Sequence, residues 1–101
     1  MIKEALILEE AGADLMVVEC VPSSLGGDLS AALNIPVIGI GAGPGTDGQV
    51  LVLQDMLGIS QRLPKFSKDF LKESNSIQDA ITAFGNEVRS GTFPAPEHSF
   101  K

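Results

Sequence analysis

The sequence contains no tryptophan and no tyrosine, and only one cysteine and one histidine among its 101 residues. A single cysteine excludes an internal disulfide framework, and no histidine or cysteine pair has the spacing of a zinc site. Basic residues are also scarce, with 7 Lys and Arg against 13 Asp and Glu. Protein surfaces that bind nucleic acid are typically basic, so the net charge of -6 argues against nucleic acid as a partner.

Long apolar stretches are missing as well. Glycine, proline or a charged residue interrupts every apolar run well short of the roughly 18 residues of a membrane span, so no membrane partner is expected. No secretory signal is visible at the amino terminus, and we expect a reduced, cytoplasmic setting. With 44% hydrophobic residues, the composition is that of a folded chain about one domain long, for which two independent cores are not expected.

The first half of the chain alternates helical and strand patterns. An amphipathic pattern predicts a helix over residues 2–11, and Gly12 stands where such a helix would end. Residues 14–21 and 37–40 are apolar without alternation. Such runs are typical of parallel strands that are covered on both faces.

The segment between these two predicted strands is expected to be a short helix. Ser23 or Ser24 would supply its cap, and Leu33 lies near its end. Gly26 and Gly27 each weaken the helix by about 1 kcal/mol relative to alanine.

The second half of the chain is less regular. Residues 49–53 are expected to form a third short strand and residues 54–58 one helical turn. Residues 59–75 show no clear periodicity, and a stretch of this kind is usually functional or held by a partner surface. A helix is predicted from a cap at Ser76 to Gly91, and the tail after it is expected to lie over a surface. The buried stripe of that helix would comprise Ile77, Ala80, Ile81, Phe84 and Val88.

The order of these elements predicts an α/β protein with three parallel strands joined by right-handed crossovers. Three strands cannot close a barrel, since eight β/α units need about 250 residues. The chain is therefore either a small open sheet with two exposed edges or the last piece of a larger barrel. In both cases residues 1–101 belong to one domain.

Glu19 stands out among the candidate functional residues. It ends an apolar strand, and active sites of α/β folds open at the carboxyl ends of parallel strands. Aliphatic neighbours would desolvate its carboxylate and make it a better proton acceptor near neutral pH. A structural ion pair or a cap on backbone amides explains this position equally well, and the residues alone leave both open.

A glycine-rich loop follows the second strand. The glycines of residues 39–43, among them Gly41 and Gly43, could let backbone amides approach an anion. A tight exit from the strand is the simpler explanation. Asp47, which precedes a glycine, is typical of a turn.

The remaining reactive or charged side chains carry weaker signals. Cys20 is expected to be an inert core thiol, because it adjoins a buried run and has no histidine nearby. His98 is expected at the surface of the tail. Lys65, Lys68 and Lys72 lie in a segment with neighbouring acids and are expected to face solvent or a partner.

Several segments in chain order resemble one family over nearly the whole sequence. The segments are VVECVP (17–22), IPVIGIGAG (35–43), TDGQVLV (46–52), QDMLG (54–58), PKF (64–66) and PEHSF (96–100). They are similar to the carboxyl-terminal part of ketopantoate hydroxymethyltransferase, a family also called 3-methyl-2-oxobutanoate hydroxymethyltransferase.

The resemblance implies a fold and a reaction. The fold is an eight-stranded (β/α)8 TIM-type barrel of the phosphoenolpyruvate mutase-like group in a homo-oligomer, of which this chain would hold the last three strands and helices. The reaction transfers a one-carbon unit from methylenetetrahydrofolate to 3-methyl-2-oxobutanoate and gives 2-dehydropantoate for pantothenate and coenzyme A synthesis. In the family a magnesium ion chelates the keto acid and acidifies the neighbouring C–H. The family's general base matches Glu19.

The same resemblance implies that the rest of the site lies outside this chain. The family's metal ligands and keto-acid-binding residues belong to earlier strands, so no metal ligand or substrate-binding residue is assigned, and Gly41, Gly43, Asp47 and His98 receive no role. We expect the chain alone to be inactive and an amino-terminal complementary fragment to complete it. Two alternatives remain, a non-catalytic truncated product that associates through its sheet edges and a phosphate-binding loop in an unrelated barrel.

Overall fold

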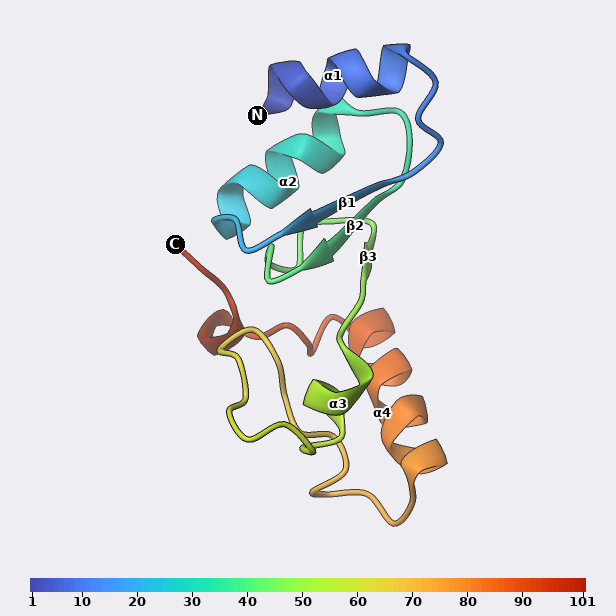
Figure 1. Cartoon of the computed structure of the whole chain (residues 1–101), viewed down its shortest axis with the longest axis vertical. Coiled ribbons are helices and arrows are strands. Elements are labelled where there is room, and N and C mark those ends of the chain that lie inside the picture. Colours follow the sequence, from blue (N-terminus) through green and yellow to red (C-terminus); the bar gives the residue numbers. More distant parts are fainter.

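A computed structural model describes residues 1–101 and shows an elongated molecule of 44 × 25 × 24 Å with two lobes (Figure 1). The sheet lobe contains α1 (Ile2–Glu10), β1 (Met16–Glu19), α2 (Ser23–Ala32), β2 (Val37–Ile40) and β3 (Gly48–Gln49). The helical lobe contains α3 (Leu53–Met56), α4 (Ile77–Ser90) and the 3-10 turn Pro96–His98. None of the helices combines the length and the apolar character needed to cross a membrane.

The three strands form one parallel sheet in the order β1-β2-β3, which confirms the prediction of parallel neighbouring strands. Met16 lies opposite Val37 and Glu19 lies opposite Ile40, so β1 and β2 end at the same level. Because β2 is central, β1 and β3 each have one free edge, as expected for an open sheet.

The third strand is shorter and begins earlier than predicted. Pairing covers Gly48–Gln49 instead of residues 49–53, and helix α3 already begins at Leu53. Val50 and Val52 are exposed. These apolar residues suggested a longer strand, but after the bond from the Val50 N–H to the Gly39 carbonyl oxygen of β2 at 3.0 Å, the chain makes no further pairing with β2.

Helices α1 and α2 cover one face of the sheet (Figure 1). Side chains alternate between the two faces of a strand, so only Val18 of β1 is buried against the helices. Val17, on the other face, is 58% exposed. The prediction that both faces of β1 are covered is therefore wrong within this chain. The buried cluster comprises Ala5, Val18, Val21, Leu29, Leu33, Val37 and Ala42.

Helix α2 begins without the predicted serine cap. Its N-cap residue is Pro22, and Ser23 and Ser24 occupy the first turn with no side-chain cap hydrogen bond. Gly26 is buried against the backbone carbonyl of Ala42, where an added Cβ would overlap the oxygen. The glycine that weakens the helix thus lets the loop after β2 pack directly on it.

Helix α4 has the predicted ends. The Ser76 side chain accepts a hydrogen bond from the first turn, and Gly91 closes the helix in the left-handed conformation with φ 81°. The predicted stripe is correct for Ala80, which is buried, and wrong for Ile77 and Ile81, which are exposed. The helix meets its neighbours over a narrower face than its apolar pattern suggested.

A second buried cluster holds the helical lobe together, where the composition suggested a single core. It comprises Met56, Leu57, Phe70, Ala80 and Phe93. The rings of Phe70, Phe84 and Phe93 meet edge to face, with centroids 5.4–6.0 Å apart. Residues 59–75 contain no helix or strand, as their lack of periodicity predicted, and Phe70 anchors them in this cluster.

Candidate functional site

The carboxyl ends of β1 and β2 form the candidate site. Glu19 is the last residue of β1 and lies opposite Ile40, the last residue of β2. The N–H of Cys20 donates a hydrogen bond to the Ile40 carbonyl oxygen at 2.9 Å, so pairing continues past Glu19. The backbone that carries the carboxylate is therefore fixed on one side by β2.

The Glu19 side chain is exposed, contrary to the expectation that aliphatic neighbours desolvate it. It borders an apolar cavity of about 340 Å³ along the free edge of β1, where Leu8 and Val17 also contribute. Its carboxylate makes no hydrogen bond or ion pair with any residue of the chain. Neither of the structural explanations that the sequence left open, an ion pair or an amide cap, is present within this chain.

Cys20, directly after Glu19, has φ 54° and is the one non-glycine residue with positive φ. A side chain in this region costs about 1–3 kcal/mol, and such strain clusters at functional sites. The thiol is exposed, so the prediction of a core cysteine is wrong. The left-handed backbone turns the chain away from the strand and takes the side chain out of the sheet.

The glycine-rich loop is tightly packed. Gly41 has φ 68° and lies under the ring of Phe66, whose Cδ2 would be 2.9 Å from an added Cβ. Gly43 has φ 79° and packs against Ser23 at the start of α2. This geometry agrees with a tight exit from β2 and gives no support to an open phosphate-binding loop.

The chain's tail also reaches this end of the sheet, as Figure 1 shows in red. Phe100 forms an isolated parallel bridge with Pro22, and its carbonyl oxygen accepts a hydrogen bond from the Ser23 N–H at 2.9 Å. The Lys65 ammonium lies 5.2 Å from the centroid of the Phe100 ring. The expectation that the tail lies over a surface is confirmed, and at Phe100 that surface is the start of α2, a few residues after Glu19.

Two carboxylates accept backbone N–H groups at the opposite, amino-terminal end of the sheet. Asp47 accepts the N–H of Val37 at 2.8 Å, so it anchors β2 in addition to shaping its loop. Glu9 accepts the N–H groups of Asn34 and Ile35 at 2.6 and 3.0 Å. The role of Glu9 could not be predicted from the sequence, because Glu9 resembles any exposed acid at the end of a helix.

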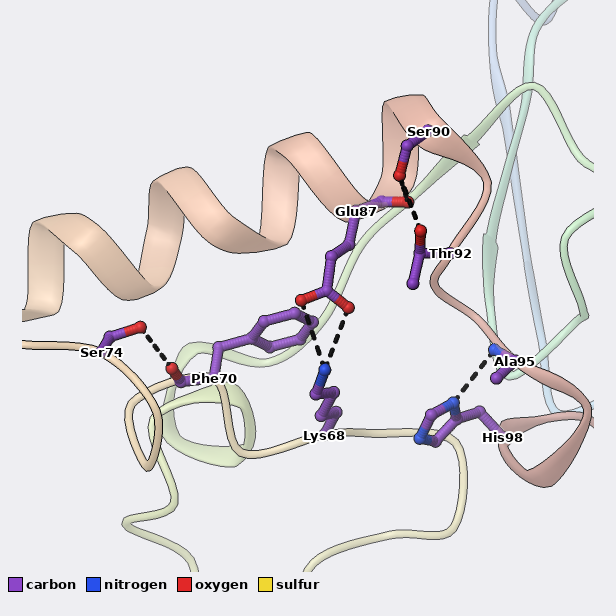
Figure 2. Close-up of polar contacts among 8 residues, drawn as sticks. All are labelled: Lys68, Phe70, Ser74, Glu87, Ser90, Thr92, Ala95 and His98. Atoms are coloured by element: carbon purple, nitrogen blue, oxygen red, sulfur yellow. Dashed lines mark hydrogen bonds and ion pairs between the residues drawn. The ribbon is translucent and has the colours of Figure 1, made fainter.

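His98 is half-buried, where a surface position was expected (Figure 2). Its Nδ1 accepts a hydrogen bond from the Ala95 N–H at 3.0 Å, and its ring centroid lies 4.9 Å from that of Phe93. Burial lowers the pKa of His98, the charge of Lys68 lowers it further, and Glu97 opposes the change.

Lys68 does not face solvent or a partner as predicted. Its Nζ lies 3.0 and 3.3 Å from the two carboxylate oxygens of Glu87 in α4 (Figure 2). The same ammonium lies 5.1 Å from the centroid of the Phe70 ring. The long segment before α4 is therefore attached to that helix by charge as well as by apolar packing.

The residues of this chain do not fit a magnesium site. No group of three or more His, Cys, Asp or Glu side chains lies close enough to hold a metal ion, whereas Mg²⁺ requires near-octahedral oxygen ligation. The metal that the resemblance implies has no ligand set here, and no chemical step of this chain is derived through it.

Comparisons with known proteins agree over almost the whole length. A family model described as Ketopantoate hydroxymethyltransferase matches residues 1–96. The 3-methyl-2-oxobutanoate hydroxymethyltransferase of Alteromonas mediterranea is 57% identical over 102 residues, which cover 100% of this chain and 39% of that protein. Proteins of the same name from Idiomarina loihiensis and Saccharophagus degradans are 56% and 55% identical. Those matches cover 99% of this chain and 38% and 37% of the two proteins.

Proposed function

The chain belongs to the ketopantoate hydroxymethyltransferase family, as its motifs predicted, and we propose that it is the carboxyl-terminal portion of such an enzyme. It spans less than two fifths of the length of the curated relatives named above. The proposed complete enzyme transfers a one-carbon unit from methylenetetrahydrofolate to 3-methyl-2-oxobutanoate and forms 2-dehydropantoate. The folate donor, the cytoplasmic setting and a homo-oligomer follow from the family resemblance alone.

Glu19 is proposed to be the general base of this reaction. Its carboxylate takes the proton from the carbon beside the keto group, and the electron pair of that C–H bond becomes the enolate. The enolate carbon then forms a C–C bond to the methylene carbon of the folate, whose two C–N bonds break. Water supplies the hydroxyl group of the product, and tetrahydrofolate leaves. A positioned base of this kind contributes about 10²- to 10⁴-fold to the rate.

One observation carries this assignment. Glu19 ends β1 at the sheet's carboxyl edge, and its carboxylate has no partner within the chain while its backbone is held by β2. A base must keep its oxygen lone pairs free for the substrate proton, and a carboxylate engaged as a cap or in an ion pair does not. The left-handed residue that follows and the apolar cavity beside the side chain support the same assignment.

The free edge of β1 is proposed to pair with the preceding strand of the complete barrel. Residues alternate in a parallel pair, so the amides of Met16 and Val18 face β2 and those of Val17 and Glu19 point to the free edge. A strand placed there would cover Leu15 and Val17, which are exposed, and would desolvate Glu19. Such pairing is what the TIM-type barrel implied by the family resemblance requires.

The test is complementation with the amino-terminal part of the Alteromonas mediterranea enzyme, ending where the match begins. The purified chain should form no 2-dehydropantoate from the two substrates, because nothing in it acidifies the keto acid. Mixing with the complementary part should restore turnover. Glu19→Gln should then lower kcat about 10²- to 10⁴-fold, while Glu10→Gln, an exposed acid on α1, should leave it unchanged.

Two results would contradict the proposal. Turnover by the chain alone would show that it needs no complement. A complemented Glu19→Gln variant with normal kcat would show that another group is the base.

A non-catalytic interaction module is the second candidate, favoured by the exposed apolar residues along β1. It predicts that the chain self-associates through that edge and binds no complementary part. Sedimentation of the chain with and without the amino-terminal part separates the two candidates.

A further inference from the structure

The tail between Ala95 and Phe100 joins the two lobes. At one end, the 3-10 turn Pro96–His98 packs on the helical lobe, where the His98 ring contacts Phe93. At the other end, Phe100 pairs with the backbone at the start of α2. We refer to residues 95–100 as the strap.

The strap is fastened to the sheet lobe by few contacts. One hydrogen bond, Ser23 N–H to Phe100 O, joins its far end to the sheet lobe, and the ammonium of Lys65, from the segment before α4, lies over the Phe100 ring. Beside it lies a cavity of about 300 Å³ lined by Ser23, Pro44, Pro94, Pro96, Ser99 and Phe100. Because this space beside the strap is unfilled, the strap gains little from packing, and its conformation depends strongly on each polar contact.

His98 closes the turn at the base of the strap through a neutral imidazole. Its Nδ1 lone pair accepts the Ala95 N–H at 3.0 Å. A protonated imidazole carries hydrogen on both nitrogens, so Nδ1 can no longer accept and would face the Ala95 N–H as a second donor. The same turn also contains the bond from Ser99 N–H to Pro96 O at 3.2 Å.

The charges around the imidazole favour the same neutral form. Lys68, from the long segment before α4, faces the ring and repels a second positive charge. Glu87 of α4 and Glu97 of the strap attract it, but both oxygens of Glu87 are already engaged by Lys68. Burial and the charge of Lys68 together outweigh the two acids, so the pKa of His98 lies below its ordinary value of 6.5.

We propose that the strap is a proton-sensitive element, docked on the start of α2 just after β1 while His98 is neutral and released when His98 is protonated. Because the docked state binds the proton more weakly, docking is complete above pH 6.5 and weakens as the pH falls through the pKa of docked His98. Release frees the N–H of Ser23, four residues after Glu19, from its bond to Phe100. The proposal does not depend on the assignment of Glu19 as a base.

Hydrogen exchange of the Ser23 amide in the full chain tests the proposal, because that N–H is bonded to the strap. Its protection factor should be constant above about pH 7.5, fall by up to about tenfold per pH unit between 6.5 and the lower pKa of docked His98, and level off below that pKa. The Met16 amide, bonded to Pro36 inside the sheet lobe, should keep its protection and show that the lobe stays folded.

His98→Asn is the matched variant, since the asparagine oxygen can accept from Ala95 N–H in place of Nδ1 and does not titrate. Its Ser23 protection should stay constant over this pH range. As a second measurement, the ring protons of the only histidine should titrate with a midpoint below 6.5, close to the pH at which the fall in Ser23 protection levels off in the unmutated chain.

Three results would overturn the proposal: a Ser23 amide unprotected at pH 7.5, an equal fall of protection in the unmutated chain and His98→Asn, or a histidine midpoint at or above 6.5.

Discussion

The two lobes are stabilised by different chemistry. The sheet lobe is aliphatic, and carboxylates fasten its turns by accepting backbone N–H groups, as Asp47 does for Val37. The helical lobe is built around three phenylalanine rings and the ion pair between Lys68 and Glu87. Each lobe has its own buried cluster, so the stability of one need not follow the stability of the other.

The difference matters because the candidate site draws on both lobes. The sheet lobe supplies Glu19, while the helical half supplies the groups that lie over the strand ends, Phe66 on Gly41 and Phe100 on Pro22. Loss of the helical cluster should therefore expose the site without moving Glu19, whereas damage to the sheet lobe should displace the carboxylate itself.

The largest effect is expected from Phe70→Ala, which removes the ring at the centre of the helical cluster. Truncation of a buried phenylalanine costs about 3–5 kcal/mol, so α4 should lose amide protection while β1 and β2 keep theirs. Residue-level hydrogen exchange measures both lobes in one experiment. Leu63→Ala, at an exposed position of the same segment, is the control. Equal loss in both lobes would show that they form a single cooperative unit.

Gly26→Ala tests the sheet lobe in the same way. The added methyl overlaps the Ala42 carbonyl oxygen, which is backbone and cannot move aside easily, and we expect a loss of about 3 kcal/mol. Gly27→Ala, one residue away with nothing within 4 Å of the new Cβ, should instead stabilise α2 by up to about 1 kcal/mol. Urea unfolding followed by circular dichroism gives both values. Two variants of equal stability would contradict the close packing.

Asp47→Ala is expected to cost less, about 1–2 kcal/mol, because the N–H of Val37 and the hydroxyl of Ser30 lose their acceptor. The loss should appear in the sheet lobe alone, as faster exchange of the Val37 amide. Asp28→Ala, an exposed acid on α2, serves as the control. Unchanged exchange at Val37 would mean that water replaces the carboxylate at no cost.

The smallest effect is expected from Glu87→Gln, below about 1 kcal/mol, because the ion pair with Lys68 is partly exposed and screened by solvent. The difference from the unmutated chain should shrink in about 1 M salt. The substitution also removes an acid that raises the pKa of His98, so the histidine midpoint should fall further. Glu73→Gln, at an exposed position in the segment before α4, should leave the histidine midpoint unchanged. An unchanged midpoint would show that the charge of Glu87 does not reach the His98 ring, and a rise would contradict the expected sign.

The parts of the fold that were predictable are those whose determinants are local or lie within the chain. Residues 37–40 were correctly predicted because β2 has a strand on each side. Helix α4 carries its own signals in Ser76 and Gly91. The length of the third strand and the burial of β1 were mispredicted, because an apolar residue can pack on a neighbour but does not guarantee that one is present. Within this chain no element covers Val50 and Val52 after β3 or the face of β1 that carries Val17.

The candidate site divides in the same way. Glu19 was placed correctly at a strand end because strand ends can be located from the apolar pattern, while its exposure could not be predicted. The contacts of Phe66 with Gly41 and of Phe100 with Pro22 join residues 25 and 78 positions apart, and no local pattern encodes them. Cys20 was misassigned because sequence alone does not reveal a left-handed backbone.

The single bridge between Phe100 and Pro22 also has a mechanical consequence. Tension applied from the carboxyl-terminal side reaches this bridge before it reaches either buried cluster. One hydrogen bond carries the load there, so the bridge should yield at low force while both lobes remain folded. The molecule would then lengthen in a small first step, well before either cluster breaks.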